Sequence, residues 1–163
     1  LEWFAPARDG VRVFSNRGVN GIDGVVSTAV GVALSSKAPT ALLIGDIAML
    51  HDSNGLLNLT RRDAHMKIII VDNEGGGIFS FLPQAESLDG AQFEQLFGTP
   101  HSVDFESLAK THGIPFAWAT TTDELRRELG NPGTCIIGVR TDRKLNVDHH
   151  NALYAAVAEA LTK

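Results

Sequence analysis

Two apolar, β-branched runs of the sequence end in residues that can bind a metal ion. The first run leads into Gly45 and Asp46, and the second leads into Asp72, Asn73 and three consecutive glycines. The interval between Asp46 and Asn73 leaves room for one helix and one return strand. If both runs are strands of a parallel sheet, their carboxyl ends meet at one edge, where ligands of such sheets bind.

The residue types at these two strand ends suit a hard divalent cation bound to phosphate. Mg²⁺, or Mn²⁺ in its place, takes oxygen ligands, and Asp46 offers a carboxylate oxygen and Asn73 an amide oxygen. A backbone carbonyl of the glycine-rich turn can supply a third ligand. Gly45 lets the backbone approach a diphosphate closely, and the amides of Ile47 and Ala48 at the next helix start add donors. The simpler alternative is that Asp46 caps a helix and Asn73 only turns the chain.

Other phosphate-binding motifs are missing or incomplete. The sequence contains no Walker A motif, and the pattern Gly-x-Gly-x-x-Gly that Gly75 and Gly77 begin has Ser80 in place of its third glycine. Nicotinamide binding is therefore disfavoured. An aspartate after Gly, followed about two dozen residues later by Asn, resembles the thiamine diphosphate motif.

Composition excludes several classes of partner. The chain has 163 residues, a formal net charge of −5 and one cysteine, Cys135. A negative charge argues against nucleic acid or an anionic membrane as the main partner, and one cysteine permits no internal disulfide. Without a disulfide framework, a reducing cytoplasm is the expected location, and no stretch reaches the length of a membrane span. Because the sequence begins at Leu1 without an initiator Met, we expect a piece of a longer protein.

The hydrophobic pattern predicts an α/β domain with a parallel sheet and helices on both of its faces, because apolar strand patterns alternate with helical ones. One domain is expected over residues 1–163. The predicted strands are Val11–Phe14, Thr40–Ile44, Lys67–Asp72, Phe116–Ala119 and Thr134–Val139. The predicted helices are Gly24–Leu34, Ser53–Arg62, Asp104–Thr111 with an Asp N-cap, a helix after the capping box at Thr121, and Asp148–Leu161. Gly75–Val103 shows no convincing regular element, which in a stretch of that length usually accompanies function.

Longer motifs carry a specific resemblance. The segments are Phe14–Gly24 (Phe-Ser-Asn-Arg-Gly-Val-Asn-Gly-Ile-Asp-Gly), Gly45–Ala48 (Gly-Asp-Ile-Ala) and Asn73–Pro83 (Asn-Glu-Gly-Gly-Gly-Ile-Phe-Ser-Phe-Leu-Pro). Together they resemble the 2-succinyl-5-enolpyruvyl-6-hydroxy-3-cyclohexene-1-carboxylate synthases of menaquinone biosynthesis, the MenD family of thiamine diphosphate enzymes. The resemblance covers essentially the whole chain, as the C-terminal, diphosphate-binding domain of that family.

The resemblance implies roles for particular residues. Asp46, Asn73 and the carbonyl of Gly75 hold Mg²⁺, and the diphosphate-binding surface consists of Gly21, Ile22, Gly45, Asp46, Ile47, Ala48, Asn73 and Gly75. Ile22 matches the apolar wedge that bends thiamine diphosphate. Arg17 falls where the family places an arginine facing the substrate, and Ile78, Phe79 and Leu82 fall where apolar side chains line the pocket. The implied reaction decarboxylates 2-oxoglutarate and adds the succinyl unit to isochorismate.

Two departures limit what the resemblance implies. Many thiamine diphosphate proteins have Gly-Asp-Gly-Ser where this chain has Gly-Asp-Ile-Ala, so a hydroxyl donor is missing, and Asp72 places a second carboxylate either near the diphosphate or pointing away. No residue here matches the glutamate that activates the cofactor, so the chain holds no catalytic residue of its own. The resemblance implies a pyrimidine-binding N-terminal domain from another subunit, in a homodimer or homotetramer. Open alternatives are another 2-oxo acid decarboxylase or acetohydroxyacid synthase half, and a non-catalytic thiamine diphosphate module.

Overall fold

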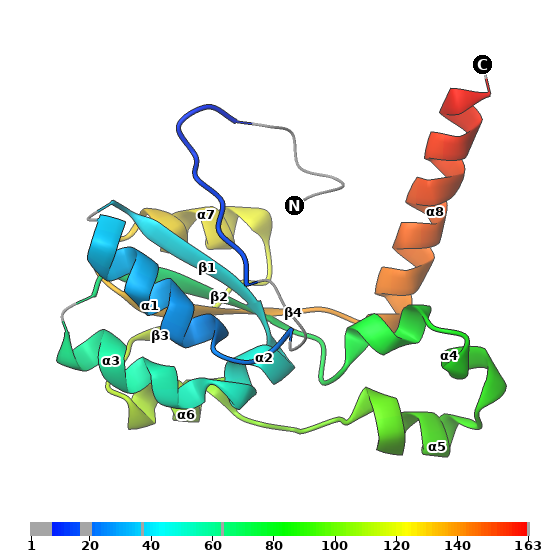
Figure 1. Ribbon diagram of the computed structural model, residues 1–163, viewed down its shortest axis with the longest axis horizontal. Helices are drawn as coiled ribbons and strands as arrows, with labels where there is room; N and C mark the ends of the chain where they lie inside the picture. The colour runs from blue at the N-terminus through cyan, green and yellow to red at the C-terminus, as the bar shows by residue number, and fades with distance from the viewer. Residues whose placement is uncertain (1–7, 17–20, 37, 63, 163) are drawn as a thin grey trace.

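A parallel four-stranded sheet forms the centre of the molecule (Figure 1). The computed structural model describes residues 8–16, 21–36, 38–62 and 64–162. The spatial order of the strands is β1-β2-β4-β3. Their bounds are Thr40–Gly45 for β1, Met66–Asp72 for β2, Phe116–Trp118 for β3 and Cys135–Arg140 for β4. The prediction of an α/β domain with a parallel sheet is confirmed.

The register of the sheet brings the two polar strand ends to the same edge. Gly45 of β1 pairs with Val71 of β2, and Asp72 of β2 pairs with Arg140 of β4. Asp46 follows Gly45 directly, so it leaves the sheet beside Asp72. Both carboxylates stand at the carboxyl ends of parallel strands, where open α/β sheets bind their ligands.

One face of the sheet carries the main hydrophobic core. Three helices pack there: α1 (Val25–Ser36), α3 (Leu56–Arg61) and α6 (Phe105–Thr111). Their side chains Val26, Leu56 and Phe105 meet Ile68 and Ile136 of the sheet, all at most 1% exposed. This packing fixes the strand ends, because burial of several large apolar side chains is the main stabilising contribution in a domain of this size.

The opposite face is covered only in part. Ile69 of β2 and Ile137 of β4 are buried there, and Figure 1 shows α7 (Thr122–Gly130) on that side. Leu43 of β1 nevertheless remains 58% exposed. The expected cover on both faces is therefore present over the middle of the sheet and open over β1.

Helix caps read from the sequence are present. The Asp104 carboxylate accepts a hydrogen bond from the amide of Glu106 and caps α6. Thr121 and Glu124 form the reciprocal capping box that begins α7. Each cap satisfies amides that have no partner within the helix, which explains why the sequence pattern located these boundaries correctly.

Three sequence-based expectations are wrong or incomplete. Val11–Phe14 forms no strand: within the described ranges no strand pairs with it, and its apolar side chains are mostly exposed. The stretch Gly75–Val103 contains short helical turns rather than none. The last helix begins at Arg143, before the predicted Asp148. Elements not predicted separately are α2 (Asp46–His51), η1 (Ser53–Gly55), η2 (Gly77–Phe81), α4 (Gln84–Ser87), α5 (Gly90–Phe93) and η3 (Glu94–Gly98).

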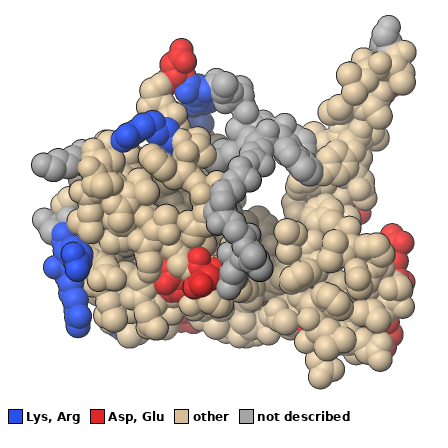
Figure 2. Space-filling view, in the orientation of Figure 1, with Lys and Arg blue, Asp and Glu red and all other residues tan. Residues whose placement is uncertain are grey.

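The last helix, α8 (Arg143–Leu161), projects away from the sheet (Figure 1). Every residue from Asn151 to Thr162 is exposed, and Glu159 is the only charged residue among them. Figure 2 accordingly shows this helix as an almost uncharged surface. No helix in the described ranges is long and apolar enough to cross a bilayer.

Candidate cofactor site

The Asp46 carboxylate joins the two strand ends. It is 2% exposed at the start of α2. Its Oδ2 accepts hydrogen bonds from the amides of Asn73, at 3.2 Å, and Gly75, at 2.8 Å. Its Oδ1 accepts one from the amide of Ile47, at 2.7 Å. The structure therefore brings Asp46, Asn73 and Gly75 together as the spacing predicted.

Asn73 presents an unpaired oxygen at this junction. Its Oδ1 is buried and has no hydrogen-bond partner among the described residues. A buried polar atom without a partner is rare in native proteins and calls for an explanation, such as a ligand. Gly77 makes room for this amide, because a Cβ at position 77 would lie 2.5 Å from Nδ2 of Asn73.

The glycine-rich turn has no space for larger residues. Gly75 has φ +140°, and a Cβ there would collide with the carbonyl oxygen of Gly98. The Gly76 amide donates to that same carbonyl at 2.7 Å. The Gly75 carbonyl accepts a hydrogen bond from the amide of Gly77 at 2.9 Å, which leaves its second lone pair for another partner.

Asp72 lies near the same junction but already has partners. It is 6% exposed, and its Oδ1 accepts from the amide of Glu74 at 3.2 Å. Its Oδ2 lies 3.9 Å from Nε of Arg140. The sequence left open whether Asp72 lies near the diphosphate or points away. The carboxylate lies close to the junction, and it faces the guanidinium of Arg140, which offsets part of its charge.

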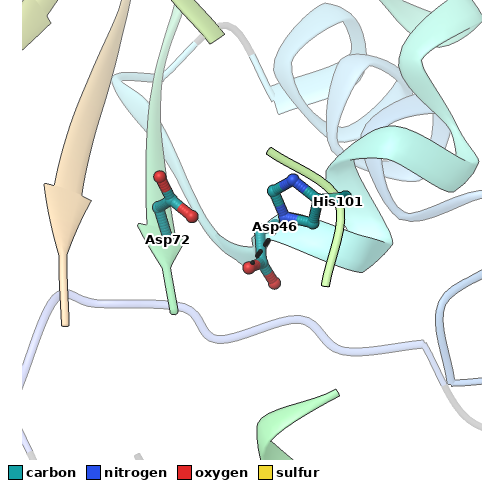
Figure 3. A group of neighbouring side chains, drawn as sticks. All are labelled: Asp46, Asp72 and His101. Carbon is teal, nitrogen blue, oxygen red and sulfur yellow. Dashed lines mark hydrogen bonds and ion pairs between the residues drawn. The ribbon is translucent and has the colours of Figure 1, made fainter. Parts of the chain in front are cut away.

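His101 is the member of the site that sequence reasoning missed. Figure 3 shows its ring against Asp46, and Nε2 lies 3.1 Å from Oδ2 of Asp46. Asp46, Asp72 and His101 each have a metal-binding atom within 4.8 Å of the others. His101 follows no strand and matches no ligand spacing, so no sequence signal pointed to it. Only the folding back of Gly75–Val103 over α2 brings it here.

The remaining predicted cofactor residues lie at the start of α2 or just before α1, and their role in binding stays a prediction. Gly45 has ordinary φ and ψ of −77° and 158°, and a Cβ there would touch nothing in the chain. Ala48 is half-buried in α2, while Gly21 is exposed and Ile22 half-buried just before α1. Arg17, expected to face the substrate, lies outside the described residues.

The three apolar residues expected to line a substrate pocket are exposed. Ile78, Phe79 and Leu82 belong to or directly follow η2, with exposed fractions of 73%, 37% and 41%. Phe79 packs edge-on against Phe97, with ring centroids 5.7 Å apart. They form a surface next to the glycine-rich turn, and their role in a pocket stays a prediction.

Charged residues of both signs line a cleft of about 760 Å³ on the Asn73 side of β2 and β4. Its basic residues are Arg140, Arg143 and Lys144. Arg143 is already paired with Glu94, at 2.7 Å, and Arg140 lies over the ring of Trp118, at 4.4 Å. The first contact joins the start of α8 to η3, and the second joins the ends of β4 and β3.

Comparison with known families identifies the fold and its cofactor. Residues 4–132 match the family model described as the thiamine pyrophosphate enzyme, C-terminal TPP binding domain; thiamine pyrophosphate is another name for thiamine diphosphate. The chain belongs to this family. Thiamine diphosphate is therefore the cofactor of the family to which this chain belongs.

Several curated relatives of this chain carry the same name. The chain is 46% identical over 153 residues to the 2-succinyl-5-enolpyruvyl-6-hydroxy-3-cyclohexene-1-carboxylate synthase of Bacillus velezensis, covering 91% of this chain and 26% of that protein. It is 45% identical to the synthase of Chloroflexus aurantiacus, covering 99% of this chain and 28% of that protein. The chain thus spans about a quarter of the length of the curated relatives it matches.

Solved structures share the fold of the domain. Benzoylformate decarboxylase from Polynucleobacter necessarius superposes with a TM-score of 0.63 at 24% identity, over 76% of this chain and 24% of that chain. A thiamine diphosphate-dependent 4-hydroxybenzoylformate decarboxylase from Rhodococcus jostii RHA1 gives a TM-score of 0.56 at 24% identity, over 70% of this chain and 22% of that chain. At this identity the likeness establishes the architecture alone.

Proposed function

We infer that this chain is the diphosphate- and metal-binding domain of a 2-succinyl-5-enolpyruvyl-6-hydroxy-3-cyclohexene-1-carboxylate synthase. The observation that carries the inference is the junction of Asp46, Asn73 and Gly75 at the ends of β1 and β2. The relatives at 46% and 45% identity support the particular synthase. The proposed domain covers residues 1–163.

The junction fits Mg²⁺, or Mn²⁺ in its place, because its available atoms are oxygens of the kind such ions bind. The buried Oδ1 of Asn73 lacks a hydrogen-bond partner among the described residues. Oδ1 of Asp46 accepts a single hydrogen bond, from the amide of Ile47, and so has a lone pair left for a cation. The Gly75 carbonyl adds a third oxygen. The metal would offset the charge of the diphosphate, which otherwise would face the carboxylates of Asp46 and Asp72.

The residues of this chain would bind and orient the cofactor. Gly45 leaves the end of β1 open to a close approach of the diphosphate, and Ile22 would hold the bent form in which the reacting groups are close. When bound, thiamine diphosphate supplies the electron sink for decarboxylation of a 2-oxo acid. Ile78, Phe79 and Leu82 would exclude water from the substrate, and Arg17 would pair with an anionic group on it.

The reaction proposed for the whole protein joins 2-oxoglutarate and isochorismate with loss of carbon dioxide. A pyrimidine-binding domain, supplied by another subunit of a homodimer or homotetramer, would contribute the activating glutamate. The exposed apolar side chains of η2 and α8 are compatible with such a partner, because contiguous apolar surface usually marks an interaction site. The isolated chain is accordingly expected to bind cofactor and to be inactive.

The other candidates named from the sequence are less well supported. The fold alone would also suit half of a decarboxylase or of an acetohydroxyacid synthase. The curated relatives above are instead named 2-succinyl-5-enolpyruvyl-6-hydroxy-3-cyclohexene-1-carboxylate synthase. A non-catalytic thiamine diphosphate module would bind cofactor and never turn over, whatever domain is added.

Two measurements test the proposal. Calorimetric titration of thiamine diphosphate into the chain, with Mg²⁺ or with chelator, should give binding only with Mg²⁺. The complete protein that carries this chain should consume isochorismate with 2-oxoglutarate and leave it unchanged with pyruvate. Consumption of pyruvate alone would favour the acetohydroxyacid synthase class, and cofactor binding without turnover of either acid would favour the module.

A further inference from the structure

We propose that His101 is a positioning residue for Asp46: its Nε2–H donates to Oδ2 and fixes the carboxylate so that Oδ1 faces the metal. The inference rests on the proposed function of the junction and adds a residue to it. His101 lies outside the Gly-Asp and Asn segments of the motif, in the loop that leads into α6. Its side chain is 10% exposed.

The hydrogen bonds of the ring determine which nitrogen carries the proton. The amide of Val103 donates to Nδ1 of His101 at 3.0 Å, so Nδ1 accepts. In a neutral imidazole the other nitrogen then carries the hydrogen. Nε2–H therefore points at Oδ2 of Asp46, 3.1 Å away, and donates. Carboxylates that bind metal ions are commonly hydrogen-bonded in turn by neighbouring groups that fix their orientation.

The hydrogen bonds of Asp46 are divided unequally between its two oxygens. Oδ2 accepts three, from the amides of Asn73 and Gly75 and from His101. Oδ1 accepts one, from the amide of Ile47. Oδ2 is thereby occupied, and Oδ1 is the oxygen with capacity for a cation. Loss of the His101 donor would leave Oδ2 held by the two backbone amides alone, with no side-chain donor to fix the plane of the carboxylate.

The ring itself is held firmly. His101 packs edge-on against Phe105, the buried first residue of α6, with centroids 5.7 Å apart. With Nδ1 bound to Val103, Nε2 bound to Asp46 and the ring against Phe105, the imidazole has no free nitrogen to offer. Although Asp46, Asp72 and His101 are close enough together to bind one metal ion, the two hydrogen bonds of the ring favour a role through Asp46 over direct ligation.

Backbone strain gathers at the same place. In the described part of the chain, the non-glycine residues with positive φ are Glu74 at 54°, Thr99 at 42° and Ser102 at 50°. Glu74 follows Asn73, and the other two flank the loop that carries His101. Residues other than glycine are rarely held in this region, and they gather at functional sites. The loop is therefore strained into the conformation that brings His101 to Asp46.

Two substitutions separate the two hydrogen bonds of the ring. His101→Gln can place an amide NH₂ near the position of Nε2 and keep the donor to Asp46. His101→Asn can place its oxygen near Nδ1 and keep the acceptor for Val103, but it is too short to reach Asp46. The measurement is the Mg²⁺ concentration at half-saturation of thiamine diphosphate binding, with calorimetric stoichiometry recorded in the same titrations.

We expect His101→Asn to raise that Mg²⁺ concentration by about 10–100-fold, the usual loss when an outer-shell partner of a metal ligand is removed, with unchanged stoichiometry. His101→Gln should stay close to the parent. A merely structural role would instead lower the stoichiometry, through unfolded protein, and leave the Mg²⁺ midpoint in place. Equal midpoints for all three proteins would overturn the inference, whereas failure of the parent itself to bind would overturn the proposed function.

A spectroscopic measurement needs no variant and no cofactor. Long-range ¹H–¹⁵N correlation of the His101 ring should show the hydrogen on Nε2 and none on Nδ1. A hydrogen on Nδ1 would contradict the inference, because that tautomer cannot accept from Val103 and donate to Asp46.

Discussion

The strand-end junction and the surface formed by η2 and α8 differ in how far this chain completes them. Asp46 is almost fully buried, and four hydrogen bonds hold its carboxylate. Ile78 of η2 and Val157 of α8 are 73% and 53% exposed. The hydrogen bonds at the junction are therefore complete within this chain, whereas the apolar side chains of η2 and α8 remain exposed. The proposed function explains this difference, because it assigns the junction to the diphosphate and the exposed apolar surface to a second domain.

The largest effect should come from Asp46→Ala. It removes the charged ligand and leaves the amides of Asn73 and Gly75 without an acceptor. We expect Mg²⁺-dependent cofactor affinity to fall by about a hundredfold or more, and the free energy of unfolding to fall by about 3 kcal/mol.

Asp46→Asn is the matched control for folding, because it keeps an acceptor oxygen for the amides while losing the charge. It should retain more stability than Asp46→Ala and bind cofactor nearly as poorly. Unchanged affinity in calorimetry for either variant would remove Asp46 from the metal site.

A smaller effect is expected from Gly77→Ala. The new methyl group would crowd Nδ2 of Asn73 and displace the amide that carries the unpaired Oδ1. Cofactor affinity should fall about tenfold, equivalent to about 1.4 kcal/mol. Gly90→Ala is the control, since a Cβ at position 90 meets nothing within 4 Å. Equal losses in both variants would show that helical backbone, and not Asn73, is responsible.

Thr121→Ala should lower stability without touching the site. It removes the cap of α7, which typically costs about 1 kcal/mol, and cofactor affinity should stay unchanged.

The stability of the α7 cap also depends on pH. Hydrogen bonds from the side chain and then the backbone of Thr120 lower the pKa of Glu124. A lowered carboxyl pKa stabilises the fold above the unfolded-state pKa, and this contribution is lost as the pH falls through the folded-state value. Because Thr121→Ala leaves both Thr120 donors in place, parent and variant should lose this contribution alike, and the difference between them should stay constant in acid-denaturation experiments.

The smallest effect should come from Val157→Ser on the exposed face of α8. In the chain alone, the free energy of unfolding should change by no more than about 0.5 kcal/mol, because the side chain is mostly in water already. Met49→Ala, at a fully buried position, should cost about 2–5 kcal/mol in the same denaturant titrations. A large loss for Val157→Ser would mean that α8 is covered even without a partner.

The sequence was sufficient for the parts of this molecule that depend on local pattern. Strand runs, caps and the pairing of Asp46 with Asn73 follow from hydrophobic period and from parallel topology. His101 could not be found in this way, because its contact with Asp46 depends on a strained loop folding back over α2. The contact between Nζ of Lys67 and Sγ of Cys135, 3.3 Å apart, was missed for another reason: it depends on the register of β2 against β4, which the strand patterns alone do not determine. Val11–Phe14 has a strand-like composition, but no neighbouring strand pairs with it.

The central claim is that this chain binds the diphosphate end of thiamine diphosphate through a metal ion at Asp46, Asn73 and Gly75. A competition titration tests this claim most directly. Thiamine diphosphate would be titrated into the chain with Mg²⁺ in the presence of either inorganic pyrophosphate or thiamine. The account predicts that pyrophosphate displaces the cofactor, that thiamine does not, and that chelation of Mg²⁺ abolishes binding. Displacement by thiamine, or binding that persists without the metal, would contradict it.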